Sequence, residues 1–346
     1  MKQYLIPESG HFYKANMHCH TTCSDGRLTP TEIKEHYKAQ GYSVVAYTDH
    51  EVMVDHSDLN DGEFLAITGY ELETHNGANA PFGLGEAGPN YHLNFYAAKP
   101  DETDYPFPNP DYAWGNARAI ADTQAYYRGD YIRKYSVEGQ NELIAEARAK
   151  GYRVSFNHPD WSLQNYNGYI GLEGITAVEV YNTGCALGGW IQDEGHHALD
   201  DYLKVGKRVY PVAADDNHGT RGMCGGWIRL KAPELSYDAI MNAYDQGDFY
   251  ASWGPDLDAL YFEDGFVKVD VPAEAHVVRA IVHTGIRRSY SRFGEDMTHI
   301  EFDLNGYLNL IRDSRYPASL AYFRVELIDN RGRKAMTRGY FLDELQ

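Results

Sequence analysis

The pattern of hydrophobic and polar positions repeats along roughly the first 250 residues of the chain. A segment with helical spacing of apolar residues is followed by a glycine, then by a short apolar segment typical of a buried strand, and then by polar residues. Repeated helix–strand units of this kind predict an α/β fold with a parallel sheet or a barrel. The predicted units are a helix from Thr29 to Gly41 with a strand over Tyr42–Tyr47, a helix over Glu142–Lys150 with a strand over Tyr152–Phe156, a helix over His197–Lys204 with a strand over Arg208–Ala214, and a helix over Tyr237–Asp245 with a strand over Phe249–Ser252.

Past Pro255 the pattern changes to short strands. Asp264-Gly265 lies between two apolar segments and is a hairpin turn signal. The sequence FRVEL at 323–327 alternates apolar with charged residues, which predicts a half-buried strand. We therefore expect a first domain over residues 1–254 and a small β-sandwich over residues 255–346. No catalytic cluster is visible in this second part, so we expect it to serve packing or oligomer contact.

Three segments between the predicted units are irregular and rich in Gly, Asn, Pro, Asp or Tyr. They cover Asn76–Asn90, Pro100–Tyr135 and Asn182–Gly195. Loops of this length in a compact domain often serve as lids or binding loops. Surface decoration is an equally good interpretation of any one of them.

The net charge limits the classes of partner. With 31 Lys and Arg against 50 Asp and Glu, the chain carries a formal charge of −19. This balance argues against a nucleic-acid polymer or an anionic membrane surface as partner, because both would be repelled. A small anion held at a metal ion stays compatible with it. The sequence has no apolar run of about 18 residues and no apolar segment near its start, so we expect a cytoplasmic protein without a transmembrane helix.

The most informative stretch for chemistry is MHCHTTCSDGR, residues 17–27. His18 and His20 are two residues apart, so an extended backbone places both imidazoles on one face. Asp25 follows in a glycine-containing loop and can fold back toward them. Two imidazoles and a carboxylate suit a divalent ion such as Zn²⁺ or Mn²⁺. The neighbouring thiols, Cys19 and Cys23, are interpreted as packing rather than as ligands.

A further histidine, His50, follows the predicted strand Tyr42–Tyr47 within the tripeptide Thr48-Asp49-His50. Together with residues 17–27, this tripeptide resembles the PHP (polymerase and histidinol phosphatase) superfamily of metal-dependent phosphoesterases, and is most similar to its two-domain CehA/McbA-like metallohydrolases. The resemblance implies a distorted (β/α)7 barrel of about seven βα units, fewer than the eight of the common barrel.

The resemblance also implies the remaining ligands. Gly69-Tyr70-Glu71 matches a motif whose carboxylate bridges two metals in this family, with Glu73 as the alternative. The next family histidine is matched by His92, with His75 as the alternative. His158 follows the strand Tyr152–Phe156, and the family's Asp-x-His spacing selects Asp216 with His218, with Asp215 as the alternative. The implied ligand set is His18, His20, Asp25, His50, Glu71, His92, His158, Asp216 and His218.

Such a set implies two to three divalent ions, Zn, Mn or Fe. Three ions would bring +6 against −3 from Asp25, Glu71 and Asp216, leaving +3 to attract phosphate. The expected activity is hydrolysis of a small phosphomonoester or phosphodiester by a metal-bridging hydroxide. Arg27 could contact a phosphate oxygen or form a surface ion pair. Candidates for the general acid are Asp49, His75 and a metal-bound water.

Two other functions stay open. The same metals could direct attack on the carbonyl of a carboxylic ester, amide or carbamate, because the sequence shows no clear Arg/Lys cluster for phosphate. Alternatively, the chain could be a non-catalytic metal-binding scaffold.

Overall fold

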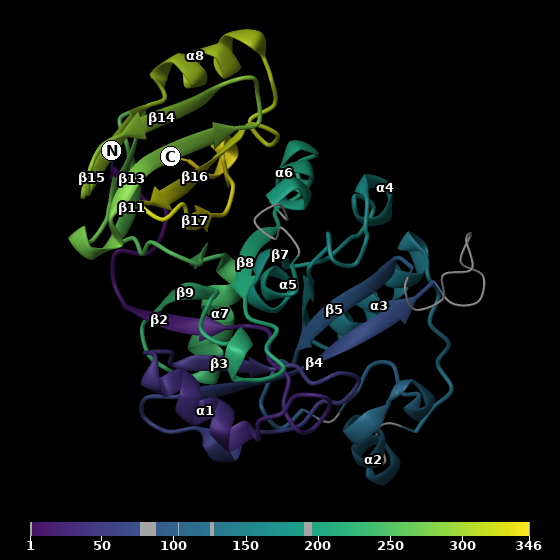
Figure 1. Ribbon diagram of the computed structural model, residues 1–346. Coiled ribbons are helices and arrows are strands. Elements are labelled where there is room, and N and C mark those ends of the chain that lie inside the picture. Colours follow the sequence, from purple (N-terminus) through teal and green to yellow (C-terminus); the bar gives the residue numbers. More distant parts are fainter. Residues whose placement is uncertain (1, 77–87, 103, 125–127, 190–195, 346) are drawn as a thin grey trace.

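The computed structural model describes residues 2–76, 88–102, 104–124, 128–189 and 196–345. Parts of all three predicted insertions, residues 77–87, 103, 125–127 and 190–195, lie outside these ranges. Figure 1 shows two bodies, a larger α/β body and a smaller body of C-terminal strands above it. Both ends of the chain lie in the smaller body.

The larger body is built on one curved sheet of mixed direction. Strands β2, β3 and β4 are parallel, as are β6, β7 and β8, whereas β5 and β9 run antiparallel to their neighbours. The structure therefore differs from a barrel of uniform βα units. In the described residues, β8 contacts β9 and β10 without forming a ladder with them. The sheet order is β10 (Phe249–Ser252), β9 (Trp227–Ala232), β2 (His11–Asn16), β3 (Val44–Tyr47), β4 (Leu65–His75), β5 (Asn90–Tyr96), β6 (Arg153–Phe156), β7 (Ala177–Asn182) and β8 (Tyr210–Ala214).

The predicted helices are present, and their ends follow local capping chemistry. At the start of the first helix, the Thr29 hydroxyl accepts a hydrogen bond from the Glu32 amide, and the Glu32 carboxylate accepts one from the Thr29 amide. Gly247 ends another helix with a left-handed backbone. The helix expected from Glu142 begins earlier, because Ser136 caps it. These helices are α1 (Pro30–Ala39), α3 (Val137–Ala149), α6 (His196–Lys204) and α7 (Tyr237–Gln246).

Four further helices were not predicted: α2 (Gly115–Thr123), α4 (Tyr166–Tyr169), α5 (Thr183–Leu187) and α8 (Asn305–Ser314). The first lies within the insertion Pro100–Tyr135, and α5 lies within Asn182–Gly195. The described part of the chain contains no helix with both the length and the apolar character that crossing a membrane requires.

The smaller body consists of two layers around an apolar cluster. Asp264 and Gly265 both have positive φ angles and form the predicted hairpin turn between β11 and β12. One layer is β1 (Lys2–Tyr4), β11 (Ala259–Glu263), β12 (Phe266–Asp270) and β15 (His299–Asp303). The other contains β14 (Ser289–Phe293), β13 (Val277–Thr284), β16 (Tyr322–Asp329), β17 (Lys334–Thr337) and β18 (Tyr340–Phe341).

Two pairings cross the expected boundary at residues 254 and 255. The first strand of the chain, β1, pairs with β11 and so lies in the smaller body. Strand β17 pairs with β10, which joins the second layer to the sheet of the larger body. The two bodies are therefore continuous through backbone hydrogen bonds.

The prediction that residues 323–327 form a half-buried strand was wrong about its polar face. Arg324 in β16 is only 1% exposed, and Glu326 is also buried. The Arg324 guanidinium donates to both carboxylate oxygens of Asp200 in α6, at 2.7 and 3.0 Å. Helix α6 of the larger body covers this face, and a charged residue that is paired can lie in such a contact.

Replacing Arg324 with Met is expected to destabilise the protein by about 1–3 kcal/mol, because the buried Glu326 would lose the guanidinium and keep only His283 at 3.3 Å and Lys334 at 3.8 Å among its described partners. Chemical denaturation measures this change. Arg312→Met is the control, since that side chain is exposed and, among the described residues, pairs only with its neighbour Asp313. Equal stability of the two variants would show that the contact between the two bodies does not depend on this ion pair.

Candidate metal centre

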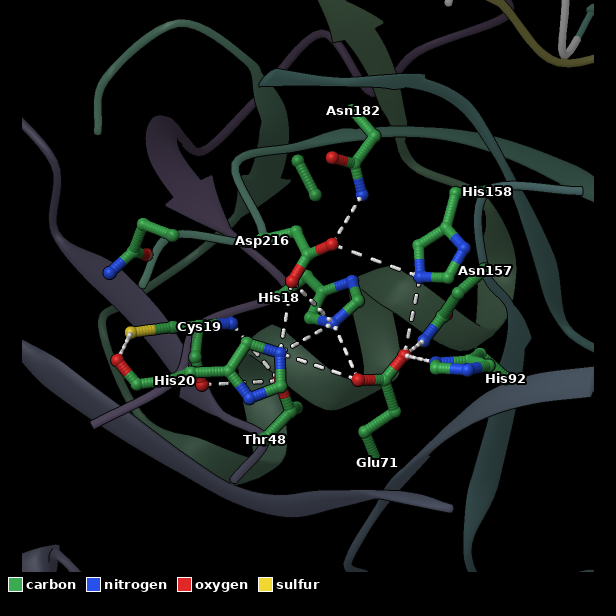
Figure 2. A network of polar contacts seen from close by, with 12 residues as sticks. His18, Cys19, His20, Thr48, Glu71, His92, Asn157, His158, Asn182 and Asp216 are labelled. Carbon is green, nitrogen blue, oxygen red and sulfur yellow. Dashed lines mark hydrogen bonds and ion pairs between the residues drawn. The ribbon is translucent and has the colours of Figure 1, made fainter. Parts of the chain in front are cut away.

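The predicted ligands come together where strands of the larger sheet end. His18 and His20 follow β2, His50 follows β3, His158 follows β6, and Asp216 and His218 follow β8; Glu71 and His92 lie on the adjacent strands β4 and β5. Each member of the predicted set offers a ligand atom to at least one group of atoms that all lie within 4.8 Å of one another. Figure 2 shows the centre of this assembly, with the side chains pointing toward one another.

Four ligand atoms at the centre have the spacing expected around one ion. His18 Nε2 and His20 Nε2 are 3.1 Å apart, and each lies 3.3 Å from Glu71 Oε2. Asp216 Oδ1 is 3.4 Å from His18 Nε2 and 3.0 Å from His20 Nε2. Ligands about 2.1 Å from a tetrahedral ion lie about 3.4 Å from each other. The donor types and their separations therefore fit a divalent metal ion.

Glu71 faces two sets of partners through its two oxygens. Oε2 is directed to the central group and lies 3.2 Å from His50 Nδ1. Oε1 lies 3.0 Å from His92 Nδ1 and 3.4 Å from His158 Nε2, and it accepts a hydrogen bond of 2.8 Å from Asn157. This carboxylate is placed so that it could bridge two ions.

The alternatives to Glu71 and His92 lie at the edge of the same assembly. Glu73 Oε1 is 2.9 Å from His92 Nε2 and 2.9 Å from His75 Nε2. His75 is the most exposed of these side chains, whereas Glu71 and His92 are buried. The geometry thus favours Glu71 and His92 as ligands, with Glu73 holding the far side of the His92 ring.

A second group contains His20, Asp25, His50 and His218. Asp25 Oδ2 lies 3.1 Å from His218 Nε2. His20 Nδ1 is buried, has no hydrogen-bond partner among the described residues, and lies 3.8 Å from Asp25 Oδ1. Native proteins seldom leave a buried ring nitrogen without a partner. A neutral imidazole binds one ion, so the His20 ring could serve this group through Nδ1 in place of the central group through Nε2.

Asp215 and Asp216 have different surroundings in the structure. The Asp215 carboxylate accepts hydrogen bonds from Thr183 and from the amides of Gly225 and Gly226, so it holds the backbone. Asp216 has a φ angle of 49°. This left-handed backbone directs the Asp216 carboxylate toward His18 and His20.

One carboxylate of the assembly, Glu179 in β7, was missed in the sequence. Its Oε1 lies 2.7 Å from His18 Nδ1, and its Oε2 accepts hydrogen bonds of 3.0 Å from the His158 amide and from Asn182. Asn182 in turn contacts Asp216 Oδ2 at 3.2 Å. The signal that could have found it is a single charged residue inside the apolar strand AVEV at 177–180.

Asp49, a candidate for the general acid, is engaged elsewhere. Its carboxylate accepts hydrogen bonds from the Thr21 amide and hydroxyl at 2.7 and 2.8 Å, and from the Ser24 hydroxyl at 2.7 Å. It is buried and is not among the described residues that line the cavity. This geometry holds the loop between His20 and Asp25 in place and favours positioning over proton donation.

A cavity of about 840 Å³ opens onto the ligand cluster. Trp114 and Trp161 line it, with ring centroids 5.5 Å from His50 and 5.0 Å from His158, respectively. Arg27 and Arg221 also line it, and neither forms an ion pair with a described residue. Arg221, three residues after His218, was not singled out in the sequence.

Buried carboxylates and imidazoles shift each other's pKa values strongly. Burial lowers the pKa of His20, but contacts with Asp216 and Glu71 outweigh burial and raise it to about 10. For His92, Glu71 and Glu73 likewise overcome burial and raise the pKa to about 10. Burial together with the charge of His20 lowers the pKa of His50 to about 3. The acids therefore attract positive charge, which protons supply when no metal ion does.

Metal binding is expected to release protons and to strengthen as the pH rises. An imidazole nitrogen that carries a proton cannot bind a metal, and the raised pKa values of His20 and His92 keep them protonated at neutral pH. Titrating the metal-free protein with Zn²⁺ in buffers of different ionisation enthalpy measures the protons released. An affinity that is equal at about pH 6 and about pH 9 would contradict this assignment of charge.

Glu179→Gln is expected to weaken metal binding by about 10- to 100-fold, the usual effect of losing a partner behind a metal-binding histidine. Glutamine offers one acceptor oxygen where His18, His158 and Asn182 contact two. Glu173→Gln is the matched control, because Glu173 is largely exposed and pairs with Lys207. Competition with a chelator measures the affinity, and equal values for both variants would exclude a role for Glu179.

Comparisons with known proteins give a partial match. A scan against protein-family models finds no matching family. A 5'-3' exoribonuclease from Haemophilus influenzae is 40% identical over 65 residues, or 18% of this chain. The chain covers only 24% of the length of that relative.

Two solved structures are similar at low identity. One is a two-domain protein from Bacteroides vulgatus that contains a predicted PHP-like metal-dependent phosphoesterase; it is 14% identical, with a TM-score of 0.45, covering 97% of this chain and 98% of that chain. The other is the lesion-specific endonuclease PfuEndoQ from Pyrococcus furiosus, 14% identical, with a TM-score of 0.39, covering 68% of this chain and 56% of that chain. The motifs of the chain resemble those of PHP-like metal-dependent phosphoesterases, and its place in the CehA/McbA-like subgroup stays a prediction.

Proposed function

We propose that this chain is a metal-dependent phosphoesterase that hydrolyses a small phosphomonoester or phosphodiester. The observation that carries the proposal is that Arg27 and Arg221 line the same cavity as the ligand cluster. Neither guanidinium forms an ion pair with a described residue, so both can bind an anion. Guanidinium groups bind phosphate oxygens through paired hydrogen bonds. A carbonyl substrate would give these two arginines no comparable role.

The assigned ligands would hold two or three divalent ions beside these arginines. When bound, such ions act as Lewis acids toward phosphoryl oxygens and lower the pKa of a bound water from about 15.7 toward about 7. The chain contributes orientation: Asn157 fixes the Glu71 carboxylate and Asn182 fixes that of Asp216. Glu179 fixes the His18 ring, so that its Nε2 faces the centre.

The walls of the cavity support a substrate whose leaving group carries a planar ring. Trp114 and Trp161 are 44% and 37% exposed, and both line the cavity next to metal-binding histidines. An exposed indole face can stack on an aryl group or a nucleobase. A polymer is less compatible with the net charge of −19, although the relative from Haemophilus influenzae is an exoribonuclease. The experiment must therefore compare small esters with a polymer.

The test is a substrate panel with the protein loaded in turn with Zn²⁺, Mn²⁺ or Fe²⁺. The panel holds p-nitrophenyl phosphate, bis-p-nitrophenyl phosphate, p-nitrophenyl acetate and a short single-stranded RNA. We expect turnover of at least one p-nitrophenyl phosphate ester. Arg27→Ala and Arg221→Ala should each raise its KM by about 5- to 10-fold, the effect of one charge-assisted hydrogen bond that is open to solvent.

Arg118→Ala is the control for these substitutions, because Arg118 is exposed and pairs with Asp111 and Asp122 outside the cavity lining. Turnover of the acetate alone would replace the proposal with carbonyl hydrolysis. Degradation of the RNA with no turnover of the small esters would show that the substrate is a polymer. If no substrate reacts with any metal, the result would support the alternative that the chain is a non-catalytic metal-binding scaffold.

A further inference from the structure

A separate group of possible metal ligands lies outside the lining of the main cavity. It consists of Cys23, Asp49 and His56, each of which offers one atom within 4.8 Å of those of the other two. Cys23 belongs to the loop between His20 and Asp25, and Asp49 follows β3. His56 precedes the short 3-10 helix η1 (Ser57–Leu59). None of the three is among the described residues that line the cavity of the main centre.

His56 gives an independent sign that this group binds a ligand. The residue is 8% exposed, and its Nε2 is buried without a hydrogen-bond partner among the described residues. Its ring lies against the ring of Tyr47, with centroids 4.7 Å apart. Because a buried polar atom in a native protein nearly always has a partner, this nitrogen is placed to bind a metal ion.

Asp49 has capacity for a further partner. Its Oδ1 accepts hydrogen bonds from the Thr21 amide and the Ser24 hydroxyl, whereas Oδ2 accepts only that of the Thr21 hydroxyl in the described residues. A carboxylate has about four lone-pair positions. These hydrogen bonds hold the group still and leave Oδ2 able to bind a cation.

We propose that Cys23, Asp49 and His56 bind a zinc ion distinct from the ions of the main centre. A thiolate, a carboxylate and an imidazole are all accepted zinc ligands, and the thiolate favours zinc over magnesium or calcium. On binding, the Cys23 thiol releases its proton to solvent and the sulfur binds the ion. Thiolate and carboxylate bring −2 against +2 from zinc, so the site is neutral, as a mostly buried location requires.

The position of this ion suggests what it does. It would connect the loop that carries His20 and Asp25 to the segment that follows His50. Those three residues contribute to one group of the main centre. The zinc ion is therefore a structural link that holds the two ligand-bearing segments at a fixed separation, and the inference does not depend on the substrate of the main centre.

The test uses the spectrum of cobalt in the full-length protein. The metal-free protein is titrated with Co²⁺, and a thiolate-to-cobalt charge-transfer band in the near ultraviolet is expected, because the main centre offers nitrogen and oxygen ligands. The band should be lost in Cys23→Ser and strongly reduced in His56→Gln. Cys185→Ser is the matched control, since Cys185 lines the main cavity. Zinc content should fall by one equivalent in Cys23→Ser and should stay unchanged in Cys185→Ser.

A second measurement needs no variant. Iodoacetamide labelling, mapped by mass spectrometry, should modify Cys23 in the metal-free protein and should be suppressed by Zn²⁺. The proposal is overturned if the wild-type protein shows no thiolate band, if the band survives in Cys23→Ser, if it is lost in Cys185→Ser, or if Zn²⁺ leaves labelling of Cys23 unchanged.

Discussion

The structure of the site depends on the burial of acidic groups among imidazoles. Glu71 is 1% exposed, and its oxygens contact histidines from four different segments of the chain. An isolated carboxylate at this depth would be strongly destabilising, so it persists only with positive charge around it. The pKa of Glu71 is held well below its usual value because His18, His92 and His50 outweigh the effect of burial. The histidines of these segments therefore provide the polar surroundings that a carboxylate needs at this depth.

Glu179 changes the charge count that the sequence implied. Asp25, Glu71 and Asp216, with Glu179 beside His18 and Glu73 beside His92, together bring −5, so two divalent ions would leave −1 and three would leave +1. Only the larger number gives the centre a positive charge of its own for an anionic substrate. With two ions, attraction of phosphate would depend on Arg27 and Arg221. The fewer ions the centre holds, the more the attraction of phosphate would depend on the two arginines.

Features that depend on neighbouring residues were predictable from the sequence, and features that depend on distant contacts were not. Helix ends depend on contacts within one turn, such as the Thr29–Glu32 capping box at the start of α1 and the left-handed Gly247 at the end of α7. The prediction that His18 and His20 share one face likewise rests on residues only two positions apart. By contrast, Arg324 is buried because α6 covers it, and the pairing of β1 with β11 joins segments at opposite ends of the chain. No local pattern contains that information.

The net charge of −19 and the two arginines of the cavity act over different distances. Charges on the surface are screened over about 8 Å at physiological ionic strength, so a long polyanion would meet many acidic groups along its length. A small phosphate ester inside the cavity would instead be surrounded by Arg27, Arg221 and the ions that the nearby ligands can hold. The net negative charge therefore disfavours a long polyanion more than a small phosphate ester, so overall charge bears on substrate size rather than on substrate chemistry.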